Sequence, residues 1–310
     1  MSISLAQHHH PQGIDGHIHQ APTSFVRKYV FSIDHKIIGI QYFVTTGIFM
    51  AIAGLLAEVI RTQLLSPNAQ FVSPDTFNEA FSVHGSAMVW LVIIPMLTGA
   101  FGNFVMPLQI GARDVAFPWL NMASFWMFPP AGLLLFGSFV IGAPQAGWTE
   151  YPPISGPQYG PPGTTMWCMA IFLVGVSSTL TGINFLVTMY KMRAPGMTFT
   201  RMPLFVWAQM ATAILSMIAT TALAGALLAL FLERVFGIPF YDPARGGSPI
   251  LWQHMFWFYS HPAVYIMILP AFGIISEIFP TFARKPIFGY KAIAFSVSYT
   301  HLTLPTILRV

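Results

Sequence analysis

Charged residues are scarce in this chain of 310 residues, where Asp, Glu, Lys and Arg together make up only 8%. That fraction is too small to cover the surface of a soluble domain of this size, so an ordinary soluble globular fold is excluded. Cysteine is nearly absent as well. Cys168 is the only one, which excludes an intrachain disulfide, and its position in an apolar stretch favours a packing role over a reactive one.

Long apolar stretches take the place of the missing charges. The chain is 55% hydrophobic, with a mean hydropathy of +0.64. A membrane-spanning helix needs roughly 20 apolar residues, and six stretches reach that length. We therefore predict an all-α fold, a polytopic transmembrane helical bundle with six full spans and a partial seventh that begins near Ile287. The six stretches lie near Ile37–Ile60, Phe81–Met106, Leu120–Ile141, Met166–Tyr190, Leu204–Leu232 and Ile250–Ile278.

The basic residues between the stretches predict an orientation. Ten of them fall in connections on one side and three on the other, which puts the N-terminus in the cytoplasm. Because they are spread among short loops and not clustered, the net charge of +4 implies no nucleic-acid partner. The ten are Arg27, Lys28, Lys36, Arg113, Lys191, Arg193, Arg201, Arg284, Lys285 and Lys291, and the three are Arg61, Arg234 and Arg245.

The segments outside the spans are polar or rich in proline and glycine. No hydrophobic core precedes Ile37, which excludes a cleaved signal peptide, and residues 1–26 are expected to form a disordered polar extension. Its histidines could bind metal adventitiously. The stretch Gly142–Gly163 cannot continue a helix and is expected to form an ordered cap on the outer face, as is Asp242–Pro249 before the sixth span.

The sixth stretch carries the clearest chemical signal. The run W-Q-H-M-F-W-F-Y-S-H-P-A-V-Y-I-M-I-L-P, from Trp252 to Pro270, sets His261 and Tyr265 four positions apart on one helix face. An imidazole inside a membrane is costly unless it binds a metal, pairs with another group or lines a water path. Taken without its context, the pair would more often be a hydrogen-bonded core histidine beside a packing tyrosine.

This run resembles the sixth helix of haem-copper oxidase subunit I, whose usual form is F-W-F-x-x-H-P-x-V-Y-I-x-I-L-P. Further segments match that family in order, among them V-H-G-S-A-M-V-W, F-G-N-F-V-M-P-L-Q-I-G-A-R-D-V-A-F-P-W-L-N and F-Y-D-P-A-R-G-G-S-P-I-L. The resemblance covers residues 27–296, the first half of a family with about twelve helices. It implies that His261 is a ligand of the active-site copper, CuB. It also implies that Tyr265 is bonded covalently to that histidine and supplies an electron and a proton to oxygen.

The resemblance also implies a haem site. His84 matches one axial ligand of the low-spin haem, for which haem a is the expected type, and Gly85 would let a macrocycle approach the backbone closely. Arg61 matches an arginine that contacts the periphery of that haem, although snorkelling to the interface would explain it as well. Trp257 is expected to contact a cofactor. The high-spin haem would take its ligand from outside this chain.

A proton pathway follows from the same resemblance. Asp114 matches the entry carboxylate of a water-filled channel, although it could instead cap the next helix or pair with Arg113. Most members carry a glutamate two residues after the copper-ligand histidine, where this chain has Ala263. A subgroup that lacks it carries Tyr-Ser before the histidine, as here, so Tyr259 and Ser260 are expected to pass protons to the copper site. The residues expected to line the channel are Asn103, Asn121, Tyr42, Ser177 and Ser178.

The electron donor is inferred from what is missing. Quinol-oxidising members carry an arginine and an aspartate on the first helix, at positions that are Ile52 and Leu56 here. Cytochrome c is therefore the expected donor, acting through a dicopper centre on oxidase subunit II, with subunit III as a further partner in the bacterial inner membrane. A quinol oxidase or a nitric oxide reductase of the same superfamily, or a non-redox membrane transporter, is the alternative. Nitric oxide reductases lack the tyrosine that Tyr265 matches.

The end of the sequence departs from the family pattern. Members continue through a full seventh helix to two adjacent histidines that bind CuB, whereas this chain reads V-S-Y-T-H-L-T-L-P-T-I-L-R-V. Residues 297–310 are expected to be non-native, and His301 is given no ligand role. Since one imidazole cannot hold copper with useful affinity, we expect this chain to be inactive alone. The expected function, that of a cytochrome c oxidase reducing O2 to water with coupled proton translocation, belongs to the complete subunit.

Overall fold

The computed structural model describes residues 24–68 and 70–296. The chain divides into two units, one ending at Ser32 and one beginning at Ile33. In the first unit the described part contains a short π-helix, η1 (Val26–Val30). The expected disordered extension and the expected non-native tail lie outside the described residues, except for the last three residues of the extension, and both stay predictions.

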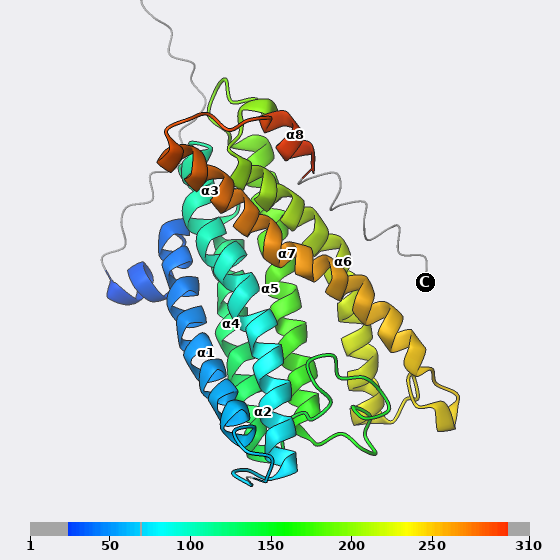
Figure 1. Ribbon diagram of the computed structural model, residues 1–310. Coiled ribbons are helices and arrows are strands. Elements are labelled where there is room, and N and C mark those ends of the chain that lie inside the picture. Colours follow the sequence, from blue (N-terminus) through cyan, green and yellow to red (C-terminus); the bar gives the residue numbers. More distant parts are fainter. Residues whose placement is uncertain (1–23, 69, 297–310) are drawn as a thin grey trace, which may run out of the picture. The chain divides into compact units, whose positions relative to one another are not determined.

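The second unit is built from helices, and the described residues contain no strand (Figure 1). Helix α2 runs on through two π-helical stretches into α3, so that four elements form one long span. The short 3-10 helices η5 (Phe199–Arg201) and η6 (Pro243–Arg245) lie in connections. The other elements are α1 (His35–Gln63), α2 (Pro74–Ser86), η2 (Ala87–Ile93), η3 (Pro95–Gly102), α3 (Asn103–Gln109), α4 (Pro118–Gly137), η4 (Ser138–Ile141), α5 (Gly163–Lys191), α6 (Leu204–Phe236), α7 (Pro249–Ala283) and α8 (Tyr290–Phe295).

Six helical segments in the described residues are long and apolar enough to cross a membrane, which confirms the predicted polytopic all-α bundle. The chain is a multi-pass membrane protein. The second span begins at Pro74, earlier than the expected Phe81, because Ser73 caps a polar first turn by accepting a hydrogen bond from Thr76 N at 3.1 Å. Of the expected seventh span the structure describes α8, which begins after Gly289 in the left-handed conformation (φ 68°).

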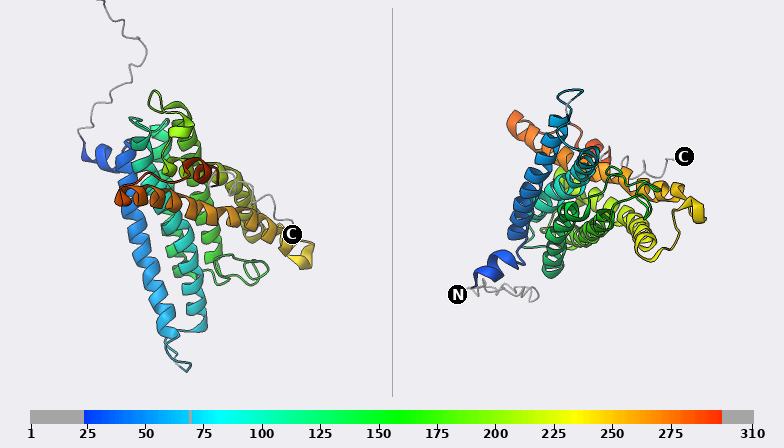
Figure 2. Two further views of the ribbon diagram at one scale, coloured as in Figure 1. Left: turned by 45° about the horizontal axis from the view of Figure 1, so that its top comes forward. Right: turned by 90° about the horizontal axis from the view of Figure 1, so that it is seen from below.

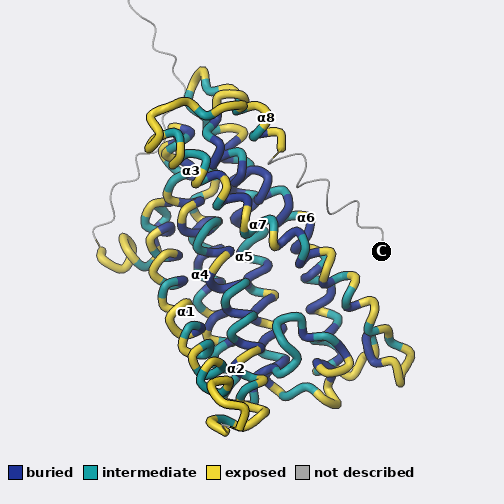
Figure 3. The backbone as a smooth tube through the Cα atoms, in the orientation of Figure 1, coloured by how far each residue is buried: buried dark blue, intermediate teal, exposed yellow. Residues whose placement is uncertain are grey.

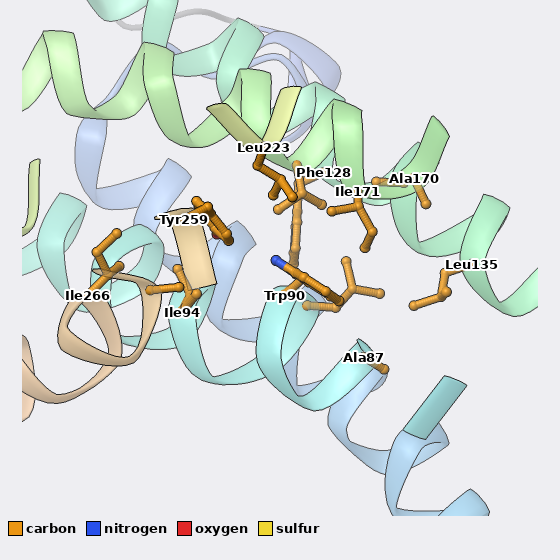
Figure 4. Packing of buried hydrophobic residues seen from close by; sticks show 14 of the residues in the cluster. Ala87, Trp90, Ile94, Phe128, Leu135, Ala170, Ile171, Leu223, Tyr259 and Ile266 are labelled. Carbon is orange, nitrogen blue, oxygen red and sulfur yellow. The ribbon is translucent and has the colours of Figure 1, made fainter. Parts of the chain in front are cut away.

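The helices pack in the order of the sequence. Helices α4, α5, α6 and α7 lie side by side in succession, and α1 packs along the α2–η2–η3 span (Figure 2). Buried residues line the interior of this unit along most of its length (Figure 3). Trp90 lies in the core, with its ring centroid 5.7 Å from that of Trp167 and 6.4 Å from that of Phe256 (Figure 4). These large aromatic contacts fix α5 and α7 against the second span.

The loop from Gly142 to Gly163 is non-helical, as its prolines predict, and it is tied to the bundle by Arg234 near the end of α6. The Arg234 guanidinium donates to Thr165 Oγ1 at 2.9 Å and to four backbone carbonyls of the loop. Charge-assisted bonds of this kind are about twice as strong as neutral ones. We call this end of the bundle the loop end, and the opposite end, where Asp114 lies between α3 and α4, the Asp114 end.

Glu150 is buried in the same loop. Its Oε1 accepts a hydrogen bond from Ala146 N at 3.2 Å, while Oε2 has no partner in the described residues. Burial raises the pKa of Glu150 from 4.5 to about 8, and the Ala146 N–H and the charge of Arg234 offset this only in part. The native loop therefore holds the carboxyl group in its protonated form at neutral pH.

This raised pKa predicts a pH-dependent stability. Because the folded state binds the Glu150 proton more tightly than the unfolded state, its stabilising effect is complete below the ordinary pKa of 4.5 and is lost as the pH rises through about 8. We expect Glu150→Gln, which cannot ionise, to flatten the fall in thermal unfolding temperature over this range. Glu58→Gln, at an exposed position of α1, is the control and should leave the slope unchanged. An unchanged slope in Glu150→Gln would contradict the assignment.

Candidate functional site

His84 lies at the end of α2 with one ring nitrogen already engaged. Its Nδ1 is 2.9 Å from the Ala53 carbonyl oxygen on α1. A carbonyl only accepts, so Nδ1 carries the proton and Nε2 carries the lone pair. No described residue hydrogen-bonds to Nε2, and the ring is half-buried. A fixed imidazole that offers an unprotonated Nε2 is what an axial ligand to haem iron requires.

Gly85, Arg61 and Trp257, the other residues expected near a cofactor, have contacts that do not define a haem site. Gly85 is packed tightly, since a Cβ there would lie 3.2 Å from Cβ of Trp148, so the group that closely approaches this glycine in the structure is the loop tryptophan. Arg61 is exposed, and the one ion pair among the described residues lies elsewhere, between Arg245 and Asp242. Trp257 donates its indole N–H to the Tyr151 hydroxyl, which ties α7 to the loop.

His261 and Tyr265 are neighbours on α7. Their ring centroids are 4.8 Å apart with the planes at 73°, and both residues are half-buried. The spacing of four residues thus brings imidazole and phenol edge to face, as the sequence predicts. The described residues contain no group of three His, Cys, Asp or Glu that could hold a metal ion. His261 can therefore supply one copper ligand but not a complete copper site.

A continuous set of hydrogen bonds begins at the Asp114 end. His35 Nδ1 is 2.7 Å from the Asn103 carbonyl oxygen, and Asn121 Nδ2 donates to Asn103 Oδ1 at 2.7 Å. All three side chains are buried, and His35 Nε2 and Asn121 Oδ1 have no partner in the described part of the chain. Because buried polar atoms are nearly always hydrogen-bonded, these two mark positions for water.

Hydroxyl groups continue the path deeper into the bundle. Ser124 donates to the Asn121 carbonyl at 2.7 Å, Ser177 donates to the Ser124 carbonyl at 2.7 Å, and Tyr42 and Ser177 share a hydrogen bond of 3.2 Å. Thr181 also donates to Ser124 Oγ at 3.3 Å. Tyr42 and Ser177, 135 positions apart in the sequence, are thus joined hydroxyl to hydroxyl, and backbone carbonyls link Ser177 to Ser124 and Ser124 to Asn121.

The hydrogen bonds of Tyr42 and Ser177 lead to an internal cavity of about 40 Å³. Its lining includes Tyr42, Ser177 and Ser178 and, on α7, Tyr259. A site needs about 10–15 Å³ to hold a water, so the space accommodates about three or four. The structure therefore brings together Asn103, Asn121, Tyr42, Ser177, Ser178 and Tyr259, the expected channel residues, along one route. We call this set, together with Ser124 and Thr181, the polar file.

Asp114 lies at the entrance to the polar file, beside His35. Its Oδ1 accepts from Val115 N at 2.7 Å. Partial burial raises the pKa of Asp114, and the repulsion of Asp34 adds to this effect, while hydrogen bonds and His35 oppose it. The two alternatives to a channel role fail, because Phe117 and not Asp114 precedes α4 at its cap, and no ion pair joins Asp114 to Arg113 among the described residues.

Ser260 and Tyr259 are both buried on α7, but only Tyr259 lines the cavity. Ser260 Oγ is buried without a hydrogen bond in the described residues, whereas the Trp90 indole N–H lies close enough to the Tyr259 hydroxyl to interact with it. Figure 4 shows Tyr259 and Trp90 facing the same interior region. The Trp90 indole N–H and the buried Ser260 hydroxyl therefore add polar groups to this part of α7 beyond the cavity.

Sequence reasoning missed His35, Ser124 and Thr181. The signals were present but weak. His35 follows the capping residue Asp34, and Ser124 and Thr181 lie three and four positions after Asn121 and Ser177, which places each on the same helix face as its neighbour. Single hydroxyls within apolar spans give no further indication of function, so only the hydrogen bonds reveal them.

Comparison with known proteins gives the family. Residues 37–305 match the family model described as Cytochrome C and Quinol oxidase polypeptide I. The chain belongs to this oxidase family. Cytochrome c oxidase subunit 1 of Thermostichus vulcanus is 51% identical over 268 residues, which are 86% of this chain and 48% of that protein. The corresponding subunit of Synechocystis sp. is also 51% identical over 268 residues, with the same coverage, and that of Bacillus sp. (strain PS3) is 46% identical over 269 residues, 86% of this chain and 44% of the relative.

The chain thus spans about half the length of the curated relatives that it matches. Membership of this oxidase family implies haem and copper in general, in agreement with the free Nε2 of His84 and the paired rings of His261 and Tyr265. The family match extends to residue 305, beyond the described residues and into the segment 297–310. The expectation that this segment is non-native stays a prediction.

Proposed function

We propose that the complete subunit to which this chain corresponds is the catalytic subunit of a terminal respiratory oxidase. It reduces O2 to water with electrons from cytochrome c and couples this reaction to proton translocation across the membrane. The observation that carries the proposal is the polar file, which leads to Tyr259 on α7, two residues from His261 and six from Tyr265. A route for protons therefore ends beside the side chains expected to take part in oxygen reduction.

In this proposal His84 holds the low-spin haem through Nε2, and haem a is the expected type. His261 supplies one nitrogen to CuB. The remaining copper ligands, the second axial ligand and the ligand of the high-spin haem come from the other half of the complete subunit. When bound, these groups supply the electron transfer and the binding of O2 that protein side chains cannot provide.

The residues of this chain have three tasks. The bond from His84 Nδ1 to Ala53 fixes the ring orientation and keeps Nε2 available. Tyr265, whose ring lies edge to face with that of His261, gives a proton and an electron from its phenol. Tyr259 and Ser260 pass protons from the cavity toward the copper site. They take the role of the glutamate that most members of the family carry at the position of Ala263. Ala263 lies one helical turn after Tyr259 and is also buried, so both can face the same space.

Cytochrome c is the proposed electron donor, acting through oxidase subunit II, with subunit III as a further partner. The apolar residues Ile52 and Leu56 support this choice over a quinol, since neither can hydrogen-bond a quinol ring. We place the protein in the bacterial inner membrane with its N-terminus in the cytoplasm. The basic residues of the connections at the Asp114 end, such as Arg113, Lys191 and Arg284, support this orientation.

The two histidine assignments predict that each substitution removes a different cofactor from the complete subunit. His261→Ala should abolish copper binding and O2 reduction and leave the low-spin haem spectrum largely intact, because His84 lies on another helix. His84→Ala should remove the low-spin spectrum, because axial ligation is the main hold on the iron. Absorption spectra and metal analysis measure both. Full copper occupancy in His261→Ala, or an unchanged low-spin band in His84→Ala, would remove that residue from its site. A protein without any haem band would instead favour the non-redox transporter.

The assignment of Tyr259 predicts a rescue. Tyr259→Phe removes only the hydroxyl, so it should slow turnover by about tenfold or more while both haems and copper are retained. Adding Ala263→Glu to this variant should restore part of the rate, since a buried acid with a raised pKa can shuttle protons near neutral pH. Wild-type turnover in Tyr259→Phe would mean that protons reach the copper site by another route.

A further inference from the structure

One side of the cavity is formed by residues that the proton route described so far does not use. Gln209, Thr212 and Ser216 of α6 line the same space as Tyr42, Ser177 and Tyr259. Their spacing of three and four residues puts them on one face of α6, and Thr220 continues that face one turn further. Gln209, Thr212 and Ser216 are called here the α6 wall.

Three polar atoms of this face lack partners in the described residues. Gln209 Oε1, Thr212 Oγ1 and Thr220 Oγ1 are buried without a hydrogen bond anywhere in the described residues. Ser216 is also buried. An unsatisfied polar group in an apolar interior costs several kcal/mol, a cost that is greater in a membrane span because no bulk water reaches it.

The threonines are held away from their usual partner. A helical threonine normally bonds the carbonyl four residues earlier, as Thr46, Thr181 and Thr188 do in the other spans. Thr221, on the exposed face of α6, does the same, at 2.8 Å from the Met217 carbonyl. Thr212 and Thr220 do not. Their hydroxyls are therefore available to a partner in the interior.

The amide of Gln209 has a fixed orientation. Its Nε2 donates to the Leu97 carbonyl at 3.0 Å. The flipped amide would place Oε1 against this carbonyl, and two acceptors cannot form a hydrogen bond, so the flipped orientation is excluded. Oε1 is therefore an acceptor that needs a donor from the cavity. The space nearby is tight, since a Cβ on Gly102 would lie 2.7 Å from the Phe185 ring and 3.3 Å from Gln209 Nε2. Glycine at 102 leaves room for this side chain.

We propose that the α6 wall binds the waters of the cavity and so forms the second side of the proton relay between Ser177 and Tyr259. Water is the occupant that fits, because it both donates and accepts, needs two to four polar partners and matches a cavity of about 40 Å³. Gln209, Thr212 and Ser216 of α6 line this one space together with Tyr42 of α1 and Ser177 and Ser178 of α5. Waters held from both sides form an unbroken line. This inference rests on the proposed function.

The test uses the assembled oxidase with the complete subunit. Thr212→Val keeps the shape of the side chain and removes the hydroxyl, and Gln209→Met with Thr212→Val and Ser216→Ala removes the whole wall. We expect the triple variant to slow proton uptake and turnover by about tenfold, and Thr212→Val by less, with unchanged haem spectra and copper content. Thr221→Val is the matched control, since its hydroxyl bonds its own helix, and it should behave as wild type.

X-ray footprinting gives a readout that does not depend on turnover. Radicals formed from bound water modify adjacent side chains, and Phe185 and Tyr42 line the cavity. Their modification should fall in the triple variant and in Thr212→Val, and should not change in Thr221→Val. If the triple variant fails to assemble, footprinting and turnover of Thr212→Val decide the question.

The outcomes separate two failures. Slow turnover in Tyr259→Phe together with wild-type turnover in the α6 wall variants would overturn this inference and leave the proposed route intact. Wild-type turnover in both would overturn the route itself. A loss of turnover without any change in the modification of Phe185 and Tyr42 would also overturn the inference, since the wall would then act without holding water.

Discussion

Every polar atom in the interior of this bundle must find a partner, because the membrane supplies no water to replace a missing hydrogen bond. This constraint explains the joined amides of Asn103 and Asn121 and the hydroxyl contacts from Ser124 to Ser177 and Tyr42. It also makes the buried polar atoms without a hydrogen bond informative. Among the buried atoms without partners in the described residues, one group lies on Asn121 of the polar file and on Gln209, Thr212 and Thr220 of α6, where water can complete their hydrogen bonds, and another lies at the loop end, on Glu150, Ser155 and Thr164. The free Nε2 of His84 is a different exception, suited to a metal.

The rest of the bundle holds these groups in place. The rings around Trp90 connect the second span with α5 and α7, the helix that carries Tyr259 and His261. At the loop end Arg234 fixes the backbone of the loop with four carbonyl bonds. Most hydroxyl and amide contacts in the file are neutral, which allows a water line to exist without a fixed charge in the low-dielectric interior.

The spans could be predicted from sequence because long apolar stretches with few charges leave no other fold, and the spacing of His261 and Tyr265 predicted their ring contact. The start of the second span could not, because Ser73 caps a polar turn that hydropathy does not register. The channel residues came from a resemblance in short segments. Thr212 and Gln209 were missed because single polar residues in an apolar helix have no periodicity of their own, and their importance depends on partners absent from the structure. The contact between Tyr42 and Ser177 joins distant segments and needs coordinates.

The central claim is that the polar file carries protons from the Asp114 end to the site of oxygen reduction. It is tested most directly by proton uptake of the complete oxidase in Asp114→Asn, followed with a pH-sensitive dye during a single turnover. The substitution keeps the size of the side chain and removes the carboxylate that the structure places beside His35 at the entrance. The account predicts that uptake and turnover fall by about tenfold or more while haem and copper content stay the same. Proton uptake at the wild-type rate in Asp114→Asn would contradict it.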